Sequence, residues 1–150
     1  IKMAQWPPHV TVATVVFSEG KYLMVEERDK TTKQLVFNQP AGHLDPGESL
    51  SEAAVRETLE ETGWDVELTG LLGLSLYHAP NDIIYHRTTF LAQPVRRLEN
   101  YRIDPDISAV HWLSYEEILA NSDRMRSPLV VAAIEQYRKG LSSSLELIYE

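Results

Sequence analysis

One segment of this chain constrains the fold more than any other: a glycine-containing loop that leads directly into a helix rich in carboxylates. The segment runs from Gly42 to Trp64 and reads GHLDPGESLSEAAVRETLEETGW. Ser49 and Glu52 form the S-x-x-E pattern of a capping box, which predicts that a helix begins there. Gly63 predicts the end of that helix, because glycine readily adopts the left-handed conformation of a C-cap. The sequence therefore predicts a loop and a helix that join at a defined point.

Three glutamates lie close together on this predicted helix. At about 100° per residue, Glu57, Glu60 and Glu61 fall within an arc of roughly 100°, next to an apolar arc that faces a core. Like-charge pairs at this spacing cost roughly a few tenths of a kcal/mol each, and a cation would offset that cost. Ligands that are all oxygen select a hard cation such as Mg²⁺ or Mn²⁺. A solvated acidic face is the common alternative, and the three glutamates alone do not separate the two interpretations.

An arginine is placed to hold these carboxylates in position. Arg56 lies four residues after Glu52 and four before Glu60, so its guanidinium can brace either carboxylate. Glu48, in the loop just before the helix, can reach back to the same arginine. Gly42 has no side chain, so its backbone carbonyl can approach a metal ion closely.

The charged and glycine positions of the segment follow one fixed spacing, which is far more specific than the glutamate cluster alone. They are Gly42, Glu48, Arg56, Glu57, Glu60, Glu61 and Gly63. This spacing resembles the Nudix box at every one of these positions. Thr58 stands where that box has an apolar residue, and we expect its methyl group to face the core.

The resemblance continues outside the box. The segments PHVTVATVV, FNQPAGHLDPGESL, WLSYEEIL and RSPLV are similar to those of the NudJ-type phosphatases within the Nudix superfamily. The resemblance implies a single α+β domain over residues 1–150, with a mixed β-sheet sandwiched between α-helices in an α/β/α arrangement. It also implies metal-assisted hydrolysis of a pyrophosphate linkage. For the NudJ type, the implied substrates are nucleoside di- and triphosphates and the pyrophosphate of hydroxymethylpyrimidine, the thiamine precursor.

We assign the metal ligands on the basis of this resemblance. Glu57, Glu60 and Glu61 are the expected side-chain ligands of Mg²⁺ or Mn²⁺, and the carbonyl of Gly42 is the expected backbone ligand. Arg56 is expected to orient the carboxylates, with Glu48 as its partner.

The general base has candidates inside and outside the helix. Glu57 and Glu61 are the candidates within it. Asp106 is the outside candidate, six residues before Trp112, where related enzymes often carry a functional carboxylate. Asp104 is a weaker version of the same idea, and an ordinary loop aspartate explains either position equally well.

Three residues are candidates for binding substrate. His43 follows Gly42 and is expected to face the phosphate chain. Arg126 precedes the N-cap and first turn of a predicted helix, where a phosphate finds a guanidinium and a helix N-terminus together. Gln39 is the amide that is expected to reach the organic group. A surface histidine or a solvated loop arginine is the alternative for the first two.

The remaining pattern predicts runs of strands with helices between them, which favours a mixed sheet packed between helices. Segments rich in β-branched and aromatic residues predict strands at 9–17, 21–26, 35–39, 66–77, 84–92 and 108–113, with a loop at 41–48. Two further helices are expected to start at Ser114 and at Ser127-Pro128.

The composition excludes several functional classes. The net charge of −8 argues against a nucleic-acid polymer as partner, because polyanion binding needs a positive field. No apolar run approaches the roughly 20 residues of a membrane span, so no membrane partner is expected. The chain has no cysteine, which excludes disulfides and thiolate chemistry and fits a cytoplasmic location. The expected partner is a small phosphorylated molecule, and nothing in the sequence specifies an oligomeric state.

Two alternatives to a NudJ-like enzyme remain. ADP-ribose pyrophosphatases often carry a proline about sixteen residues past the box, and Pro80 lies sixteen residues after Trp64. A non-catalytic nucleotide-binding protein on the same fold is the other alternative. Such proteins usually lose box carboxylates, whereas this chain retains all of them.

Overall fold

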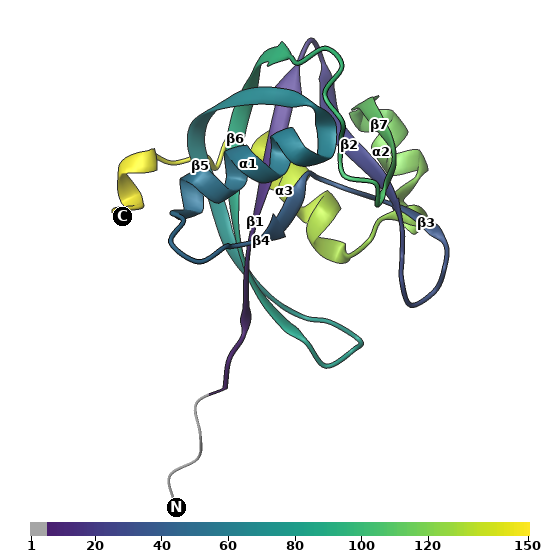
Figure 1. The fold of residues 1–150 in the computed structure, drawn as a ribbon, viewed down its shortest axis with the longest axis horizontal. Helices are drawn as coiled ribbons and strands as arrows, with labels where there is room; N and C mark the ends of the chain where they lie inside the picture. Colours follow the sequence, from purple (N-terminus) through teal and green to yellow (C-terminus); the bar gives the residue numbers. More distant parts are fainter. Residues whose placement is uncertain (1–5) are drawn as a thin grey trace, which may run out of the picture.

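A mixed sheet of seven strands organises residues 6–150, the part of the chain that this computed structural model describes (Figure 1). Residues 1–5 of the expected domain lie outside the described residues. The strands are β1 (His9–Ser18), β2 (Lys21–Arg28), β3 (Leu35–Asn38), β4 (Ala41–His43), β5 (Trp64–His78), β6 (Ile84–Arg97) and β7 (Ile107–Ser114). The helices are α1 (Leu50–Thr62), α2 (Tyr115–Ala120) and α3 (Pro128–Arg138), with short 3-10 helices η1 (Ser122–Arg124) and η2 (Leu145–Leu147).

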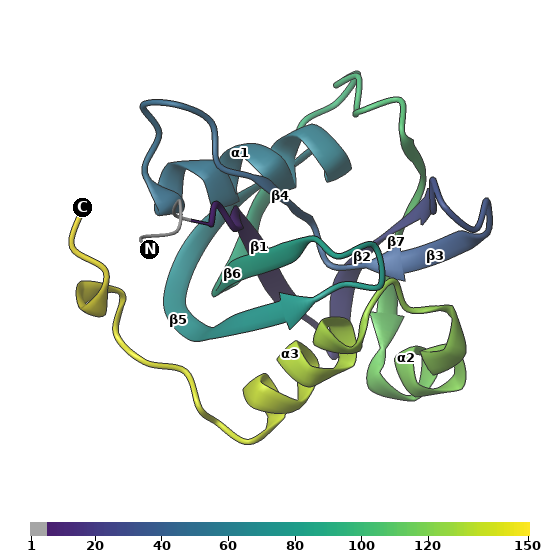
Figure 2. The same cartoon turned by 90° about the horizontal axis from the view of Figure 1, so that it is seen from below.

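The sheet combines parallel and antiparallel pairing. Its main path runs β3-β2-β1-β6-β5, while β4 pairs with β1 and β7 pairs with β2. Strands β1 and β6 are parallel, and the other pairs are antiparallel. Figure 2 shows α1 on one face of the strands and α3 on the opposite face. This arrangement confirms the expected fold class, a mixed sheet between helices.

Apolar side chains fill both sides of the sheet. Under α1, Ala53 and Ala54 pack against Val12 and Phe90. A larger cluster joins α2 and α3 to the other face: Val15, Tyr22, Met24, Phe37, Leu72, Leu113, Ile118, Val130 and Ile134. Full burial contributes about 1.5–3 kcal/mol for each large apolar side chain, so these clusters hold both helices on the sheet.

Two strand predictions differ from the structure. The three residues of β4 were expected to be loop, but they pair with β1 across a long stretch of chain, which local sequence does not specify. Strand β6 continues past the expected end at residue 92 and includes Pro94. Pro94 lies opposite Val66, next to a register shift between Asp65 and Val66, where the ladder tolerates a residue without an N–H.

Helix α1 begins and ends as its sequence predicts. Ser49 and Glu52 exchange both hydrogen bonds of a capping box, and Gly63 closes the helix with a φ of 76°. Thr58 is fully buried, and its hydroxyl donates to the Ala54 carbonyl at 2.8 Å. Because that proton is used, the Thr14 hydroxyl donates to Thr58 Oγ1 at 2.7 Å. The threonine is therefore accommodated through a buried hydroxyl pair as well as through its methyl group.

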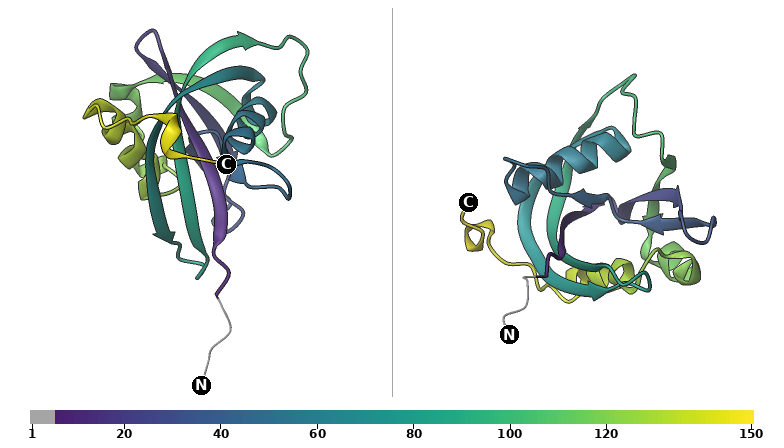
Figure 3. Two further views of the ribbon diagram at one scale, coloured as in Figure 1. Left: turned by 90° about the vertical axis from the view of Figure 1, so that its left-hand side faces the viewer. Right: turned by 60° about the horizontal axis from the view of Figure 1, so that its bottom comes forward.

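The C-terminal segment returns to the start of α1. Ser143 forms a bridge with Leu71 on β5, and the left view of Figure 3 shows the segment crossing beside the strands. The Glu150 carboxylate then accepts hydrogen bonds from the backbone N–H groups of Leu50 and Ser51. A negative charge at a helix N-terminus is favourable, so this contact stabilises the first turn of α1. No helix within residues 6–150 has the length and apolar character needed to cross a membrane.

Candidate active site

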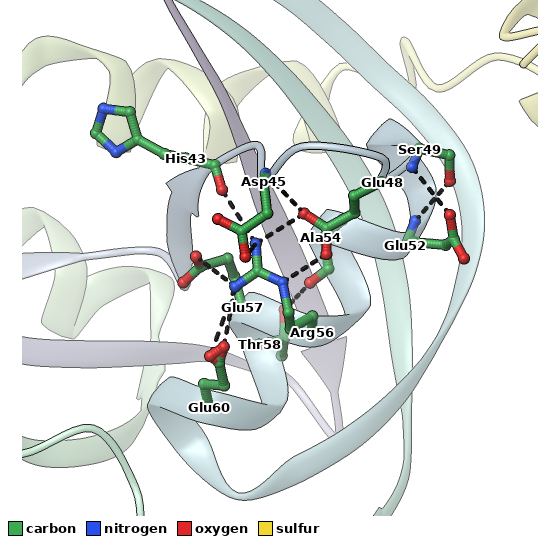
Figure 4. Close-up of polar contacts among 10 residues, drawn as sticks. All are labelled: His43, Asp45, Glu48, Ser49, Glu52, Ala54, Arg56, Glu57, Thr58 and Glu60. Carbon is green, nitrogen blue, oxygen red and sulfur yellow. Dashed lines mark hydrogen bonds and ion pairs between the residues drawn. The ribbon is translucent and has the colours of Figure 1, made fainter.

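Arg56 lies at the centre of the polar contacts on the outer side of α1. Its Nη1 donates to Glu57 Oε1 and Glu60 Oε1, each at 2.9 Å. Its Nη2 donates to the His43 carbonyl at 3.0 Å, so the arginine also ties α1 to the end of β4. Figure 4 shows the guanidinium surrounded by these groups. Of the two glutamates that the spacing allows, the structure selects Glu60, because Glu52 is used in the capping box.

Glu48 receives the other edge of the same guanidinium. Arg56 Nε donates to Glu48 Oε2 at 2.5 Å, and Nη2 donates to Glu48 Oε1 at 2.9 Å. These bonds lower the pKa of Glu48, so its carboxylate stays ionised. Glu48 Oε1 also accepts from the backbone N–H of Asp45, which closes the loop over the helix. The fork-shaped pair fixes the rotation of Arg56 and with it the positions of Glu57 and Glu60.

The Glu57 carboxylate rests directly against the backbone of β4. A Cβ atom at Gly42 would overlap the carboxyl carbon and both carboxyl oxygens of Glu57. The backbone of Gly42 does not have a positive φ, so close approach rather than conformation is the reason for glycine here. The glycine of the box therefore makes room for the first of its three helix carboxylates.

Glu61 is the most buried of the three. Its side chain is turned inward from α1, and its carboxylate accepts from the Ala41 N–H at 2.9 Å. Burial, together with the nearby negative charges of Glu27, Glu57 and Asp104, raises the pKa of Glu61 to about 9. Burial also raises the pKa of Glu57. Both carboxyls are therefore in surroundings that disfavour negative charge unless a cation is near.

These side chains fit a hard divalent cation. Glu57, Glu60 and Glu61 offer only carboxylate oxygens, the donors that Mg²⁺ and Mn²⁺ prefer, and a cation would relieve the cost of the two buried charges. In the described residues, no three acidic or histidine side chains converge on one point. Arg56 supplies the positive charge beside Glu57 and Glu60. A bound cation therefore competes with Arg56 for these two carboxylates.

The loop before β7 places Asp104, rather than Asp106, next to α1. The Asp104 N–H donates to the Glu60 carbonyl at 2.8 Å, and the Asp104 charge contributes to the raised pKa of Glu61. The Asp106 side chain is 69% exposed and lies 3.9 Å from Lys30 Nζ. The expectation that Asp106 joins the box carboxylates therefore has no support from the geometry, because its side chain pairs outward with a surface lysine.

His43 lies at the edge of the site. Its Nε2 is 2.9 Å from His9 Nδ1, and its ring makes edge contacts with His9 and Tyr85. Partial burial and the neighbouring His9 lower the pKa of His43, so the ring is neutral near pH 7. His43 therefore offers a hydrogen bond rather than a positive charge to a phosphate.

Gln39 is not positioned to contact substrate. It is 1% exposed, its Nε2 donates to the Val130 carbonyl at 2.7 Å, and its Oε1 accepts from Arg87 at 3.1 Å. Both ends of the amide are thus used inside the protein. This corrects the sequence-based expectation: Gln39 joins the segment before β4 to the first turn of α3 instead of facing the organic group.

Arg126 and Glu27 face each other at the start of α3. Arg126 Nη1 donates to Glu27 Oε1 at 2.8 Å, and the Arg126 N–H donates to the Phe37 carbonyl. Ser127 then caps α3 by accepting from the Leu129 N–H. The guanidinium of Arg126 is 41% exposed, so it remains accessible to an anion while paired.

Two residues of this region were not predicted. Glu27 follows a register shift in β2 and lies beside Arg126. Arg87 is buried in β6 near Asn38 and Gln39. The sequence signal for Arg87 is a charged residue in the strand segment IYHRTTFLA, because arginine is rarely fully buried unless it is paired.

A known protein family matches the part of the chain that forms this site. The NUDIX domain family model matches residues 7–133, which include β4, the loop, α1 and the start of α3. The chain is a Nudix hydrolase. Nudix hydrolases act on pyrophosphate linkages of small phosphorylated compounds and generally use divalent metal ions.

The relatives of this Nudix hydrolase cover nearly its whole length. Phosphatase NudJ of Escherichia coli (strain K12) is 41% identical over 141 residues, which is 94% of this chain and 90% of that protein. A solved NUDIX hydrolase from Nitrosomonas europaea is 39% identical, with a TM-score of 0.92 and coverage of 96% of this chain and 97% of that one. An ADP compounds hydrolase, 24% identical with a TM-score of 0.73 over 89% of this chain and 72% of that one, shares the fold.

A methyl group at Gly42 should disturb this Nudix site without unfolding the protein. In Gly42→Ala, the Cβ must displace the Glu57 carboxylate, and a displacement on the order of 1 Å can cost up to about 100-fold in rate. We expect kcat to fall by roughly 10- to 100-fold, measured on any substrate that the wild type hydrolyses. The matched control is Gly73→Ala, where the new Cβ meets only Gln136 Nε2 at an ordinary 3.5 Å. Equal rates for the two variants would contradict the role given to the Gly42–Glu57 contact.

Proposed function

We propose that this Nudix hydrolase is a Mg²⁺-dependent phosphohydrolase of nucleoside di- and triphosphates and related small organic pyrophosphates. Hydroxymethylpyrimidine pyrophosphate belongs to this proposed range, and Mn²⁺ is the proposed substitute for Mg²⁺. The likeness to Phosphatase NudJ, which covers nearly the whole chain, supports this range over other Nudix substrates.

The observation that carries the proposal is the anchored carboxylate cluster on α1. Arg56 holds Glu57 and Glu60, and Glu48 in turn fixes Arg56. Glu61 is held separately by the Ala41 N–H. Preorganised charges of this kind act on a reaction without paying for reorganisation when the substrate arrives. A solvated acidic surface would need neither a buried glutamate nor a glycine that leaves room for a neighbouring carboxylate.

The proposed roles follow from where each side chain lies. When bound, Mg²⁺ supplies positive charge that neutralises phosphate oxygens and acidifies water. Glu57, Glu60 and Glu61, with the Gly42 carbonyl, are the proposed ligands, and Arg56 keeps the first two glutamates oriented. Glu57 and Glu61 are the proposed proton acceptors, since the side chain of Asp106 points outward.

The proposed substrate range is broad in the organic group. In this proposal His43 and Arg126 bind phosphate groups. The side-chain oxygens of Asn38 and Gln39 instead accept hydrogen bonds from Arg87. Because the Gln39 amide and the Asn38 oxygen are used inside the protein, recognition rests mainly on the phosphate chain, which all candidate substrates share. We therefore expect several nucleoside di- and triphosphates to be hydrolysed with kcat/KM values within about tenfold of each other, or roughly 1.4 kcal/mol.

A substrate panel tests this proposal. Nucleoside di- and triphosphates, hydroxymethylpyrimidine pyrophosphate and ADP-ribose are each assayed with Mg²⁺, with Mn²⁺ and with excess chelator, and released phosphate and pyrophosphate are scored separately. Hydrolysis should vanish in chelator and return with either metal. In ¹⁸O-labelled water the label should appear on a phosphate product and not on the organic carbon.

Two results of the panel would overturn the proposal in different ways. Full activity in excess chelator would remove the metal role of Glu57, Glu60 and Glu61. A preference for ADP-ribose over every nucleotide by about 100-fold or more would reassign the enzyme to the ADP-ribose pyrophosphatases, the class to which the position of Pro80 points.

A further inference from the structure

Arg87 is a buried cation without a counter-ion. Its residue is 7% exposed, and one of its Nη atoms donates to Asn38 Oδ1 at 3.3 Å and Gln39 Oε1 at 3.1 Å. Both acceptors are neutral amides. Its Nε is buried with no hydrogen-bond partner, and no described carboxylate lies within ion-pair distance of it. Burying a charge in this way is costly unless something pairs with it.

The charges nearest to Arg87 belong to the active site. Burial lowers the pKa of Arg87 to about 10, and the charges that act on it are those of Glu61, Arg126 and Glu27. The guanidinium therefore stays ionised at neutral pH.

Successive residues of one short segment contact these charged groups or the residues that carry them. The Phe37 carbonyl accepts from the Arg126 N–H, and the side chains of Asn38 and Gln39 hold Arg87. Ala41 then holds Glu61, and Gly42 lies against Glu57. The stretch from residue 37 in β3 to residue 42 in β4 thus contacts two arginines through its first half and two box carboxylates through its second half.

This order matches the charges of a phosphate chain bound to a cation. A polyphosphate held at the box carboxylates by a cation would have a remaining phosphate available to the two arginines. Guanidinium groups bind phosphate through charge-assisted hydrogen bonds, and Arg87 has a buried N–H still without a partner. Its position on a strand, packed by two amides, keeps it rigid before substrate arrives.

From this geometry we infer that Arg87, with Arg126 beside it, binds a phosphate group of the substrate and positions the phosphate chain against the box glutamates. The inference rests on the proposed phosphohydrolase function. It adds a specific residue on β6, outside the Nudix box, to the binding of the phosphate chain.

The test measures anion binding apart from turnover. Methylenediphosphonate, a pyrophosphate analogue with a P–C–P link that is not hydrolysed, is titrated calorimetrically into metal-free enzyme. Arg87→Met should weaken its binding by at least about tenfold, the scale of losing a charge-assisted hydrogen bond. Arg87→Lys keeps the charge but lacks the planar fork of the guanidinium, so we expect an intermediate loss. Arg96→Met, at the exposed far end of the same strand, is the matched control and should bind like wild type.

Kinetics and metal binding complete the test. With nucleotide substrates, Arg87→Met should raise KM by about tenfold or more. The rise in Tm that Mg²⁺ alone produces should stay as in wild type, because Arg87 does not contact the box carboxylates. Should Arg87→Met fail to fold, Arg87→Lys and Arg126→Met, whose side chain is partly exposed, decide the question by the same titration.

The outcomes separate this inference from the proposed function. Unchanged analogue binding in Arg87→Met or, if it does not fold, in both Arg87→Lys and Arg126→Met, would mean that Arg87 only orders Asn38 and Gln39, and would overturn the inference. A wild type that hydrolyses nucleotides but does not bind the analogue would also overturn it while leaving the proposed function standing. A wild type that neither binds the analogue nor hydrolyses any pyrophosphate compound would overturn both.

Discussion

Glutamine in place of Glu57, Glu60 or Glu61 should lower kcat by at least about 100-fold in each case, the scale of losing a preorganised electrostatic element. Glutamine keeps the size of the side chain and one acceptor oxygen but removes the negative charge that a cation needs. The rate is measured with saturating nucleotide and Mg²⁺. Glu67→Gln, an exposed glutamate on β5, is the control and should keep the wild-type rate.

The stability of the Glu61→Gln variant should not fall with its rate. Glu61 is 8% exposed, and a buried amide costs less than a buried carboxyl in surroundings that disfavour charge. The Ala41 N–H can still donate to the amide oxygen of glutamine. In the absence of metal, Tm of Glu61→Gln should therefore equal or exceed that of the wild type, while the increase in Tm on adding Mg²⁺ becomes smaller. Near wild-type kcat in all three variants would show that the helix is only an acidic surface.

Aspartate variants locate the proton acceptor in the same experiment. Asp106→Asn should keep most of the rate, because its side chain faces Lys30 and solvent. A loss as large as that of Glu57→Gln or Glu61→Gln would instead make Asp106 the base and require the loop before β7 to move. Asp104→Asn should have the larger effect of the two aspartates, since Asp104 lies close enough to influence Glu61.

Replacing Arg56 by methionine should destabilise the protein by about 3 kcal/mol, which corresponds to a fall in Tm of roughly 6–12 °C. The substitution keeps the aliphatic length but leaves Glu48, Glu57 and Glu60 without the cation that they share. The Arg56 side chain is only 26% exposed, so water does not fully replace those bonds. The rate should fall by about 10- to 100-fold, because residues that orient metal ligands have effects of that size.

Two controls show whether the lost charge of Arg56 causes the destabilisation: added Mg²⁺ and replacement of a different, exposed arginine. A cation bound to the carboxylates offsets their repulsion, so Mg²⁺ should raise Tm of Arg56→Met more than it raises Tm of the wild type. Arg97→Met removes an exposed arginine at the end of β6. It should change the free energy of unfolding by less than about 0.5 kcal/mol. If Arg56→Met is as stable as Arg97→Met, the contacts of Arg56 contribute no net free energy to the fold.

Local sequence was enough to predict the loop and helix of the box. Each of its features depends on residues within about one or two helical turns. These features are the cap at Ser49, the left-handed end at Gly63 and the spacing of Arg56 to Glu60. Such contacts form wherever the helix forms, so the residue types and their spacing specify them. The same holds for the capping boxes and turns that separated the strands and placed the mixed sheet between helices.

Contacts between distant segments were decided by the tertiary structure. Gln39 was expected to bind substrate, but Val130, 91 residues later, and Arg87, 48 residues later, use both ends of its amide. Arg126 pairs with Glu27, 99 residues away, and neither this pair nor the register shift beside Glu27 in β2 has a local signature. The choice of Asp104 over Asp106 likewise depends on a bond from the loop to the end of α1.

By itself, the sequence determined that this protein carries a helix with three carboxylates, an arginine to orient them and a glycine beside them. Only the tertiary structure decided which carboxylate is buried, that β4 lies against Glu57, and that Arg87 is buried beside Asn38 and Gln39. The physical reason is that burial and desolvation depend on everything packed around a group. Spacing along the chain specifies neighbours within one helix. The pKa of Glu61 or Arg87 instead depends on strands and loops far from it in sequence.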